Sequence, residues 1–554
     1  MPKANGPFRP TDWTTVNWQK NYRMVRNLRQ RIFRATQEKN WNTVHSLQKL
    51  MLRCKSNRLD SVRRVTQVNA GKNTAGVDKI VIKTPEARGN LVDYLASFHP
   101  WRAKPAKRVY IPKSGGNLRP LGIPTITDRC LQAMVKNALE PSWESRFEAS
   151  SYGFRPGRGC HDAIANIYTL ANPKNLKKWV VDADIKGCFD NIDHEFLLKT
   201  IGPVPGRELI KQWLKAGYVD KQVFYETEAG TPQGGVISPL LANMALHGMD
   251  SFLSKEIIKK GRNIHDTRAM VRYADDFVVF CESKEDAEQA KKNLTRWLDK
   301  RGLSLSNEKT RIVHLTEGFD FLGFNIRHYK DARTKTGHKL LIKPSKKSEQ
   351  KIRDRLRDEW ITLQGSNVGA VTKKLNPIIR GWANYFRSGV SSAIFSKLDS
   401  WMFHREKRYA NRAHPTKPGY WKKKKYWGRL NPSRKDNWVF GDKNTGIVLQ
   451  KFAWFPIERH VMVKGESSPD DPRLTEYWAK RNAEKRKDLA PSLQKVAQNQ
   501  KCVCPVCRES LFNGEELHTH HVIPKSQGGK DTYTNLKLVH LYCHQQVTKH
   551  DPLV

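Results

Sequence analysis

The sequence contains little acid for the amount of base that it carries. Asp and Glu number 54 against 99 Lys and Arg, which leaves a formal net charge of +45 at pH 7. A basic excess of this size is typical of proteins that bind a polyanion, because binding releases condensed counterions. Composition alone leaves a merely solvated basic surface open as the alternative. An anionic membrane is not supported as partner, since neither end of the sequence shows a basic amphipathic helix.

Long apolar runs, internal repeats and low-complexity tracts are also missing. No stretch of about 20 apolar residues occurs, and Met1 to Thr15 contain no apolar segment of the kind found in signal peptides. We therefore expect an intracellular, cytoplasmic protein that is associated with the nucleoid when it is on DNA, and no membrane partner.

Cysteine is scarce, with nine residues in the chain. Most of the first part of the sequence holds only scattered single cysteines, as expected of buried free thiols. The last part is different, because it contains Cys502, Cys504, Cys507 and Cys543. This distribution argues against a disulfide framework and favours a local metal site.

The length of the chain predicts about three or four compact domains. Short β-rich runs such as Trp179–Val181 and Phe277–Phe280 lie among helical stretches such as Lys284–Lys300, without the regular alternation of a parallel α/β protein. We therefore predict an α+β fold. The predicted units are a basic helical extension (1–75), a mixed unit (76–343), a helical unit (344–414), a basic aromatic region (415–490), a linker (491–500) and a small Cys- and His-rich unit (501–554).

Apolar residues at helical spacing mark the unit at 344–414. Ile352, Leu356 and Trp360 fall at i, i+4 and i+8, and two similar stripes follow, so three helices with basic outer faces are predicted. We expect Trp and Phe on these stripes to belong to the core. In the next region, lysines stand between aromatics at 420–427, a pattern that can stack on bases and neutralise phosphates. A solvated charge run is the alternative.

Two adjacent acids, Asp275 and Asp276, stand between two apolar runs. The pattern predicts a β-hairpin whose tight turn carries both acids. Two carboxylates at an exposed turn repel each other unless cations bind there. A divalent-metal site is therefore predicted at this turn.

A second apolar run, at 179–181, leads into three further acids, Asp182, Asp184 and Asp190. Nucleotidyl transfer uses two Mg²⁺ ions about 4 Å apart, and carboxylates from a strand end and a hairpin turn can hold them. Charge does not decide which of the three acids serves, but the spacing to the aromatic Phe189 favours Asp184.

Further motifs surround these acids in a fixed order. They are NTAGVD at 73–78, Ile111-Pro112-Lys113, RPLGIP at 119–124, YGFRP at 152–156, GTPQGG at 230–235 with Ser238-Pro239, YADD at 273–276, GLSLS at 302–306 with Lys309, and FLGF at 321–324. This order resembles the reverse transcriptase family, and specifically the group II intron-encoded proteins, over nearly the whole chain. The resemblance implies a right-hand polymerase with fingers and palm at 76–343 and a helical thumb, or maturase domain, at 344–414.

The resemblance also implies roles for single residues of the palm. Asp184, Asp275 and Asp276 are then the carboxylates that bind Mg²⁺. Phe189 blocks a ribose 2′-OH and so selects dNTPs.

Four other residues are implied to contact the nucleotide or the template. Lys113 and Arg119 grip the triphosphate, with a generic RNA contact as the alternative for each. Gln233 contacts the template and the incoming nucleotide. Lys309 either protonates the pyrophosphate leaving group or makes an ordinary phosphate contact.

Two pairs of potential metal ligands lie near the end of the chain, Cys504 with Cys507 and His540 with Cys543. This spacing suits one tetrahedral structural Zn²⁺ with three thiolates and one imidazole. The unit is also too small to bury much core, so a metal is a reasonable stabiliser. A single CxxC could be a turn with reduced thiols, but two pairs favour zinc.

The residues between and after these pairs include His518–Pro524, Gly528-Gly529, Asn535 and His544. They resemble the HNH (ββα-metal) nuclease family, which often has Cys where His540 stands. The resemblance implies that His521 is the general base, that His520 and His544 hold a catalytic divalent cation, and that Asn535 orients the active histidine. The alternative is a zinc-stabilised DNA-binding unit without catalysis.

Group II intron-encoded proteins combine these parts in this order. The resemblance implies an RNA-dependent DNA polymerase that copies intron RNA by target-primed reverse transcription, a maturase that assists splicing, and an HNH nuclease that cuts the second strand of double-stranded target DNA. The implied partners are the intron RNA, the target DNA and dNTPs, and the implied cofactors are Mg²⁺ and Zn²⁺. Two alternatives stay open, a splicing-only RNA-binding maturase and a domesticated reverse transcriptase not linked to an intron. The intact acids disfavour the first, and the HNH unit disfavours the second.

Overall fold

Helices form the N-terminal part of the chain, which we call the N-terminal layer. The structure is a computed structural model that describes residues 10–97, 101–112, 118–253, 257–259, 262–264 and 268–550. Asn17 and Asn40 begin the first two helices, because their side chains accept hydrogen bonds from backbone N–H groups of the first turn. The elements of the layer are α1 (Trp18–Gln37), α2 (Trp41–Arg53), α3 (Lys55–Arg63), the π-helical turn η1 (Arg64–Val68), the 3₁₀ turn η2 (Ala70–Asn73) and α4 (Pro85–Tyr94).

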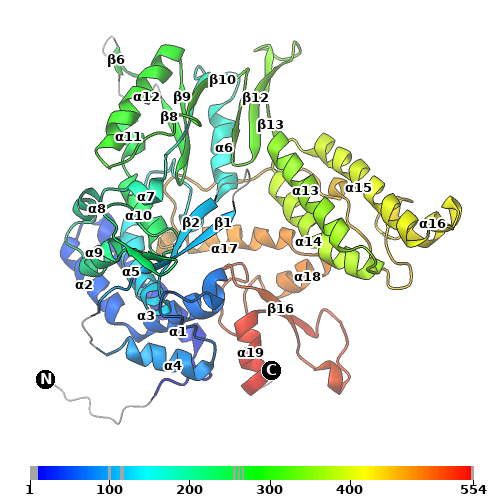
Figure 1. Cartoon of the computed structure of the whole chain (residues 1–554), viewed down its shortest axis with the longest axis horizontal. Coiled ribbons are helices and arrows are strands. Elements are labelled where there is room, and N and C mark those ends of the chain that lie inside the picture. Colours follow the sequence, from blue (N-terminus) through cyan, green and yellow to red (C-terminus); the bar gives the residue numbers. More distant parts are fainter. Residues whose placement is uncertain are drawn as a thin grey trace.

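Four antiparallel strands in the order β10-β3-β9-β8 form the palm sheet (Figure 1). Successive residues of a strand point to opposite faces. In β3, Val180 packs with α6 on one face and Val181 packs with α12 on the other. Because both faces are covered, the central strand β9 is continuously apolar after Asp276. The elements are α6 (Cys160–Leu170), β3 (Trp179–Asp184), β8 (Ala269–Tyr273), β9 (Asp276–Cys281), α12 (Lys284–Asp299) and β10 (Arg311–His314).

Three other sheets belong to this part of the chain, with strand orders β2-β1-β4-β5, β11-β12-β13 and β6-β7. Together with the helices they confirm the α+β class. The remaining elements of this part are β1 (Ala106–Pro112), β2 (Leu118–Ile123), α5 (Ile126–Glu144), α7 (Cys188–Asn191), α8 (His194–Ile201), α9 (Arg207–Lys215), β4 (Tyr218–Asp220), β5 (Val223–Tyr225), α10 (Ser238–Ala245), α11 (Met249–Leu253), β6 (Ile257–Lys259), β7 (Arg262–Ile264), β11 (Phe319–Phe321), β12 (Phe324–Lys330) and β13 (His338–Pro344).

Three helices follow the flanking sheets, at the place of the expected thumb. Ile352, Leu356 and Trp360 are buried, so the aromatic on this stripe belongs to the core. Phe386, on the second stripe, is buried as well. The helices are α13 (Lys346–Thr362), α14 (Val368–Phe386) and α15 (Ser392–Ala413).

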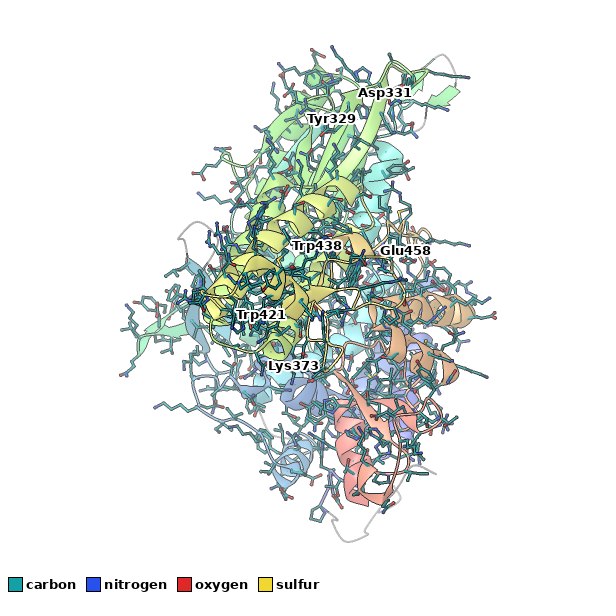
Figure 2. The ribbon with its side chains drawn as sticks, turned by 90° about the vertical axis from the view of Figure 1, so that its right-hand side faces the viewer. Tyr329, Asp331, Lys373, Trp421, Trp438 and Glu458 are labelled. Atoms are coloured by element: carbon teal, nitrogen blue, oxygen red, sulfur yellow. The ribbon has the colours of Figure 1, made fainter. Side chains whose placement is uncertain are left out.

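The basic aromatic region divides its aromatics between core and surface. Tyr426 and Trp427 are buried, whereas Tyr420 is 77% exposed. Trp421 and Trp438 lie on the face turned toward the viewer in Figure 2, each with a lysine ammonium close to its ring. The elements are α16 (Gly419–Tyr426), β14 (Trp427–Gly428), β15 (Val439–Phe440), the 3₁₀ turns η3 (Phe452–Trp454), η4 (Pro472–Leu474) and η5 (Lys485–Asp488), and α17 (Thr475–Glu484).

The C-terminal unit consists of two strands and a helix, preceded by a packed helix. Residues 491–500, expected to be a linker, form this helix, α18, which buries Val496 and Ala497. Gln500 then hydrogen-bonds both backbone groups of Leu538. The segment that the sequence suggested as a helical linker is therefore attached to the unit, because it carries apolar residues at helical spacing. The elements are α18 (Pro491–Asn499), β16 (Leu517–His521), η6 (Lys525–Gln527), β17 (Leu536–His540) and α19 (Leu541–His550).

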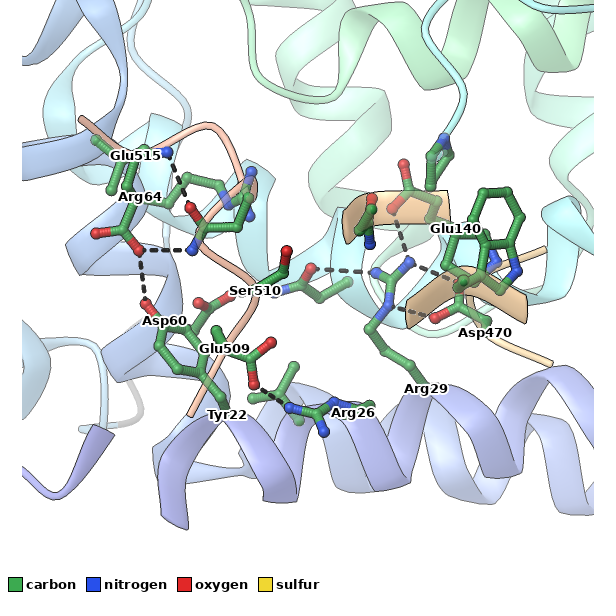
Figure 3. Close-up of a pocket in the computed structure, with 18 of the residues that line it drawn as sticks. Tyr22, Arg26, Arg29, Asp60, Arg64, Glu140, Asp470, Glu509, Ser510 and Glu515 are labelled. Carbon is green, nitrogen blue, oxygen red and sulfur yellow. Dashed lines mark hydrogen bonds and ion pairs between the residues drawn. The ribbon is translucent and has the colours of Figure 1, made fainter. Parts of the chain in front are cut away.

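A cavity of about 740 Å³ lies where the N-terminal layer, helix α5 of the unit at 76–343 and the C-terminal unit meet (Figure 3). Arg29 of α1 pairs there with Glu140 of α5 and with Asp470, at 2.9 and 2.8 Å. Arg26, one turn earlier, pairs with Glu509 of the C-terminal unit. Helix α1 thus connects segments that are far apart in the sequence.

Candidate functional site

The palm sheet brings three acids to one edge. Strand β3 ends at Asp184 and β9 begins at Asp276, and the register pairs these two residues directly. Asp275 stands in the turn between β8 and β9, next to Ala274, whose φ of 60° lies in the left-handed region. The predicted hairpin is therefore present, with one acid in the turn and the other at the first position of β9. Because directly paired residues are close neighbours, the three carboxylates converge.

The neighbouring carboxyl groups disfavour the charged forms of Asp275 and Asp276. Asp276 is reached by solvent, but the protein around it removes much of the hydration of its carboxyl group. This loss, followed by the charges of Asp275 and Asp184, raises the pKa of Asp276 to about 7. Loss of hydration also raises the pKa of Asp275. Such a cluster of oxygen donors fits Mg²⁺, which supplies the missing positive charge.

The two other acids of the β3 motif have partners elsewhere. Arg311 Nε donates to Asp182 Oδ2 at 3.0 Å, and Gln233 Nε2 donates to Asp190 Oδ2 at 2.8 Å. Asp182 stands opposite Val278 in the register, two residues away from the paired acids. The geometry therefore favours Asp184 among the three acids.

Two cations lie near the acids. Lys309 Nζ is 2.7 Å from Asp184 Oδ2, on a side chain that is 66% exposed. Arg119 of β2 is exposed, and its charge acts to lower the pKa of Asp275. Lys113, expected to act with Arg119, lies outside the described residues.

Phe189 and Gln233 lie beside the acid cluster. Phe189 is half-buried and packs edge-on against Phe154, with ring centroids 6.0 Å apart. The carbonyl oxygen of Gln233 accepts a hydrogen bond from Gly122 N–H at 2.8 Å. This bond ties the turn at 230–235 to β2, so the structure brings fingers and palm motifs together around Asp184.

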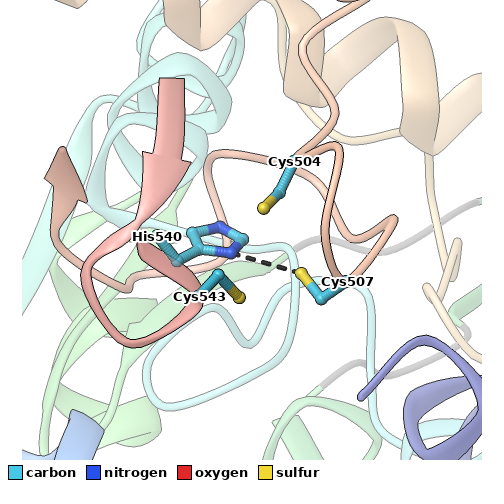
Figure 4. A group of neighbouring side chains, drawn as sticks. All are labelled: Cys504, Cys507, His540 and Cys543. Atoms are coloured by element: carbon cyan, nitrogen blue, oxygen red, sulfur yellow. Dashed lines mark hydrogen bonds between the residues drawn. The ribbon is translucent and has the colours of Figure 1, made fainter. Parts of the chain in front are cut away.

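Four buried side chains converge in the C-terminal unit (Figure 4). The potential ligand atoms of Cys504, Cys507, His540 and Cys543 all lie within 4.8 Å of one another. His540 Nε2 is 3.2 Å from the carbonyl oxygen of Ser510, and since a carbonyl only accepts, this nitrogen carries the proton. Nδ1 then faces the thiols, 3.3 Å from Cys507 Sγ. This donor set fits Zn²⁺.

The histidines of β16 point to opposite faces. His520 lies beside His544 of α19, with ring centroids 5.2 Å apart, whereas His521 Nε2 is 2.6 Å from Asp531 Oδ1. Burial lowers the pKa of both His520 and His544, so both are neutral at physiological pH, as metal ligands must be. Among the described residues, His520 Nε2 has no hydrogen-bond partner, although it is buried. Asp531 is a partner of His521 that sequence reasoning missed.

Asn535 contacts the loop after His521 rather than the imidazole. Its side chain accepts from Ile523 N–H at 2.7 Å and donates to the carbonyl oxygens of Ile523 and Lys530. Its own carbonyl oxygen accepts from Val522 N–H at 2.9 Å. Asn535 thus acts on His521 through the backbone that follows it.

Protein-family models match four successive parts of the chain. They are "N-terminal domain of reverse transcriptase" at 13–95, "Reverse transcriptase (RNA-dependent DNA polymerase)" at 111–326, "Group II intron, maturase-specific domain" at 346–427 and "HNH endonuclease" at 504–550. The chain is also 34% identical to protein YkfC of Escherichia coli over 330 residues, which are 53% of this chain and 83% of YkfC. The chain belongs to the group II intron-encoded reverse transcriptases.

Other relatives of this reverse transcriptase are matched over smaller shares. The group II intron-encoded protein LtrA of Lactococcus lactis subsp. cremoris is 33% identical over 328 residues, and the match spans 47% of this chain and 54% of LtrA. Among solved structures, a telomerase from Candida albicans aligns with 56% of this chain and 58% of its own, at 14% identity and a TM-score of 0.31, which is too distant to inform on the fold. In the described part of the reverse transcriptase, no helix is both long and apolar enough to cross a bilayer.

A buried arginine supports the acid-bearing turn of this reverse transcriptase, and sequence reasoning missed it. Arg272 is fully buried, and its Nη1 donates to Asn243 Oδ1 at 3.0 Å and to the carbonyl oxygen of Ala274 at 3.3 Å. Asn243 Nδ2 donates to the carbonyl oxygen of Gly153 at 2.9 Å, and a Cβ on Gly153 would lie 2.2 Å from Ala274 N. Arg272 and Asn243 therefore hold the YGFRP motif against the turn. The sequence did offer a signal for this role, because Arg272 is a charged residue within the otherwise apolar run 269–273.

Proposed function

We propose that this reverse transcriptase synthesises DNA on an RNA template at Asp184, Asp275 and Asp276. The observation that supports this best is the palm-sheet register, which pairs Asp184 with Asp276 and leaves Asp275 in the adjoining turn. Two Mg²⁺ ions, when bound by these carboxylates, would activate the primer 3′-oxygen and neutralise charge on the transferred phosphoryl group. The raised pKa of Asp276 supports this role, since a carboxylate that lacks counter-charge binds a divalent cation favourably.

The residues around the acids select and hold the nucleotide. Phe189 occupies the side of the site where a ribose 2′-OH would enter, and its contact with Phe154 limits its movement. Arg119 binds triphosphate oxygens, and Gln233 contacts the template and the incoming base. The hydrogen bond to Asp184 raises the pKa of Lys309, so Lys309 stays protonated at neutral pH and can neutralise or protonate the pyrophosphate leaving group.

The test of the polymerase site is the double substitution Asp275→Ala with Asp276→Ala. We expect primer extension on an RNA template to fall at least about a thousandfold, because both metal ions lose a ligand. RNA binding should be unchanged, since neither acid contacts a phosphate favourably. The matched control is Asp358→Ala, an acid of α13 whose side chain is 70% exposed. Extension at the control's rate by the double variant would refute the assignment.

The same protein binds intron RNA and target DNA. The basic faces of the N-terminal layer and of α13–α15 bind the intron RNA and assist its splicing. The region 415–490 binds the double-stranded target, and the contacts that support this are Lys425 at 5.0 Å from the Trp421 ring centroid and Lys423 at 4.4 Å from that of Trp438. Such pairs of cation and aromatic ring offer both phosphate neutralisation and stacking.

The C-terminal unit cuts the second strand of the target. His521, oriented by Asp531, removes a proton from the attacking water, and His520 with His544 holds a divalent cation. Zn²⁺, bound by the three cysteines and His540, would stabilise the unit. The cut strand then provides the 3′-OH that primes copying of the intron.

The test of the nuclease is His521→Ala. We expect loss of second-strand cleavage by about a hundredfold or more, because general-base catalysis by a positioned histidine contributes on that order. Primer extension by the same variant serves as the internal control and should not change. Retained cleavage would leave a zinc-stabilised DNA-binding unit as the better description.

Two other functions are each excluded by a different experiment. A splicing-only maturase has no need of clustered acids with raised pKa, and a domesticated enzyme has little use for a target-cutting unit. Primer extension by the unmodified chain excludes the splicing-only maturase, and sequencing of the RNA that accompanies the protein from its native cell tests the link to an intron. One long RNA that flanks this reading frame and folds as an intron supports the proposal, whereas a diverse or unrelated RNA population excludes the link to an intron.

A further inference from the structure

The C-terminal unit and the N-terminal layer share one apolar core. A single buried cluster contains Trp18, Val62 and Val65 of the layer together with Cys507 and Cys543 of the zinc cluster. In Figure 1 the last helix, α19, lies next to α3 and α4. Segments from the two ends of the sequence therefore pack as one body.

Arg63, the last residue of α3, reaches into the zinc cluster. It is 1% exposed, and its Nη2 donates to Glu515 Oε2 at 2.8 Å and to Cys543 Sγ at 3.4 Å. Its guanidinium group also lies over the ring of Trp18, 4.4 Å from the centroid. A cation this deeply buried needs a compensating charge, and here the C-terminal unit supplies it.

The helix that carries Cys543 and His544 is bound to the N-terminal layer on both sides of these residues. Tyr542 donates its hydroxyl proton to the carbonyl oxygen of Gln67 at 2.6 Å and accepts from Lys72 Nζ at 2.7 Å. Gln546 Nε2 donates to the carbonyl oxygens of Thr14 and Val16, both at 3.1 Å. The position of α19 is therefore set by contacts with the layer as well as by its own unit.

The chemistry of the zinc cluster requires a nearby cation. Three thiolates and one neutral imidazole leave a net negative charge even when Zn²⁺ is bound. In a buried site this charge is stabilised by N–H donors to sulfur, most strongly by a charged donor. Arg63 is such a donor to Cys543, and it comes from outside the unit that holds the four ligands.

We propose that the N-terminal layer completes the C-terminal unit. In this arrangement Arg63 is a positioning residue of the zinc centre, and residues 63–72 hold α19 so that His544 stays beside His520. The consequence for cleavage rests on the proposed nuclease function, whereas the consequence for zinc rests on the contacts alone. Second-strand cutting then depends on the packing of the layer, which couples the nuclease to the polymerase part of the chain.

The experiment compares two double variants in the full chain. Arg63→Met with Glu515→Gln removes the guanidinium group and also the carboxylate that would otherwise stay buried without its partner. Arg26→Met with Glu509→Gln is the matched control, because this pair joins the same two regions but Arg26 contacts no zinc ligand. The measurement is the rate at which the zinc-loaded protein releases its metal to the chromogenic chelator 4-(2-pyridylazo)resorcinol.

We expect release to be about tenfold faster or more in the Arg63 double variant, since loss of a partner behind a metal ligand commonly costs that much affinity. The Arg26 control should stay within about twofold of the unmodified chain, because the Arg26 side chain is 47% exposed and contacts no zinc ligand. Equal release rates in the two double variants would overturn the proposal. On the same samples, resistance to limited proteolysis after residue 490 verifies that the C-terminal unit of each variant is folded, and primer extension verifies the polymerase part.

A second variant decides the matter if the Arg63 double variant is not folded. Tyr542→Phe removes two hydrogen bonds and leaves no buried charge, and we expect about threefold faster zinc release, in line with the net worth of such bonds. An unchanged rate in Tyr542→Phe would then overturn the proposal.

Cleavage assays on the unmodified chain distinguish a failure of this proposal from a failure of the nuclease assignment. If the Arg63 variant releases zinc faster but the unmodified chain does not cleave DNA, the role of Arg63 at the zinc centre stands and the nuclease assignment is refuted. If the unmodified chain cleaves DNA but zinc release in the variants is unaltered, only the proposed role of the N-terminal layer is refuted.

Discussion

The two proposed metal-binding regions of this reverse transcriptase are built in opposite ways. The palm acids come from a strand end and a tight turn, and Asp276 is reached by solvent. The C-terminal cluster has four buried ligands within 4.8 Å of one another, a closeness that no other group of potential ligands reaches in the described part of the chain. Oxygen donors at an open edge suit ions that exchange with each nucleotide, whereas thiolates in a closed tetrahedral site suit a permanent ion. Solvent access to the ligands thus distinguishes the proposed catalytic site from the proposed structural site.

The cations beside the two regions differ in the same way. Lys309 contacts Asp184 from a side chain that is 66% exposed, whereas Arg63 contacts Cys543 and is almost completely buried. An exposed pair is screened by water and contributes little to stability, but its ammonium remains free to act on a substrate. A buried pair contributes to the structure and is not accessible to a substrate.

The largest effect should follow loss of a ligand from the closed region. Cys507→Ala removes one of four zinc ligands, and because a structural Zn²⁺ contributes on the order of 10 kcal/mol to folding, the C-terminal unit should unfold and lose its metal. Zinc content by atomic absorption and limited proteolysis after residue 490 measure this. Primer extension should persist, since the palm strands belong to a different apolar cluster. A full equivalent of zinc in the variant would contradict the distinction between closed and open regions.

A smaller effect on stability is expected at the palm acids, where the charged form of an acid destabilises the fold in the absence of metal. The pKa of Asp276 is raised to about 7 in the folded chain, so its protonated form favours folding. In the absence of Mg²⁺, this stabilisation is complete below about pH 4 and is lost as the pH rises through about 7. We therefore compare the melting temperatures of the unmodified chain and of Asp276→Asn in Mg²⁺-free buffer at pH 5 and at pH 8. The decrease from pH 5 to pH 8 should be about 2–4 °C larger in the unmodified chain. Identical pH dependence in the two proteins would count against repulsion among the acids.

The smallest effect on stability is expected for Lys309→Ala, about 0–1 kcal/mol, because the lysine side chain of the pair with Asp184 is largely exposed. The effect on catalysis distinguishes the two roles left open for this lysine. A general acid would show a lower kcat and a changed alkaline limb of the pH–rate profile, and Lys309→Arg would not restore it. A phosphate contact would show a higher KM for dNTPs that Lys309→Arg restores. Wild-type kinetics in Lys309→Ala would exclude both roles.

The chemistry-bearing residues could be predicted because their patterns are short. The apolar runs on either side of Asp275-Asp276 indicated the hairpin, and the paired Cys and His residues indicated the zinc cluster. The α+β class and the family are confirmed, whereas the roles of all the individual site residues, the metal ligands included, stay predictions. The segment 491–500 was less predictable, because a short polar helix is attached through a few apolar residues whose partners lie elsewhere in the chain.

By itself, the sequence determined which residues can bind metals and transfer protons, since residue type and short spacing are local properties. Only the tertiary structure decided that Asp184 rather than Asp182 pairs with Asp276, that Arg272 lies beneath the acid-bearing turn, and that Arg63 contacts Cys543. These contacts join residues that are distant along the chain, or they depend on the register in which two strands pair. They follow from the packing of whole sheets and helices, a property that no short stretch of sequence contains.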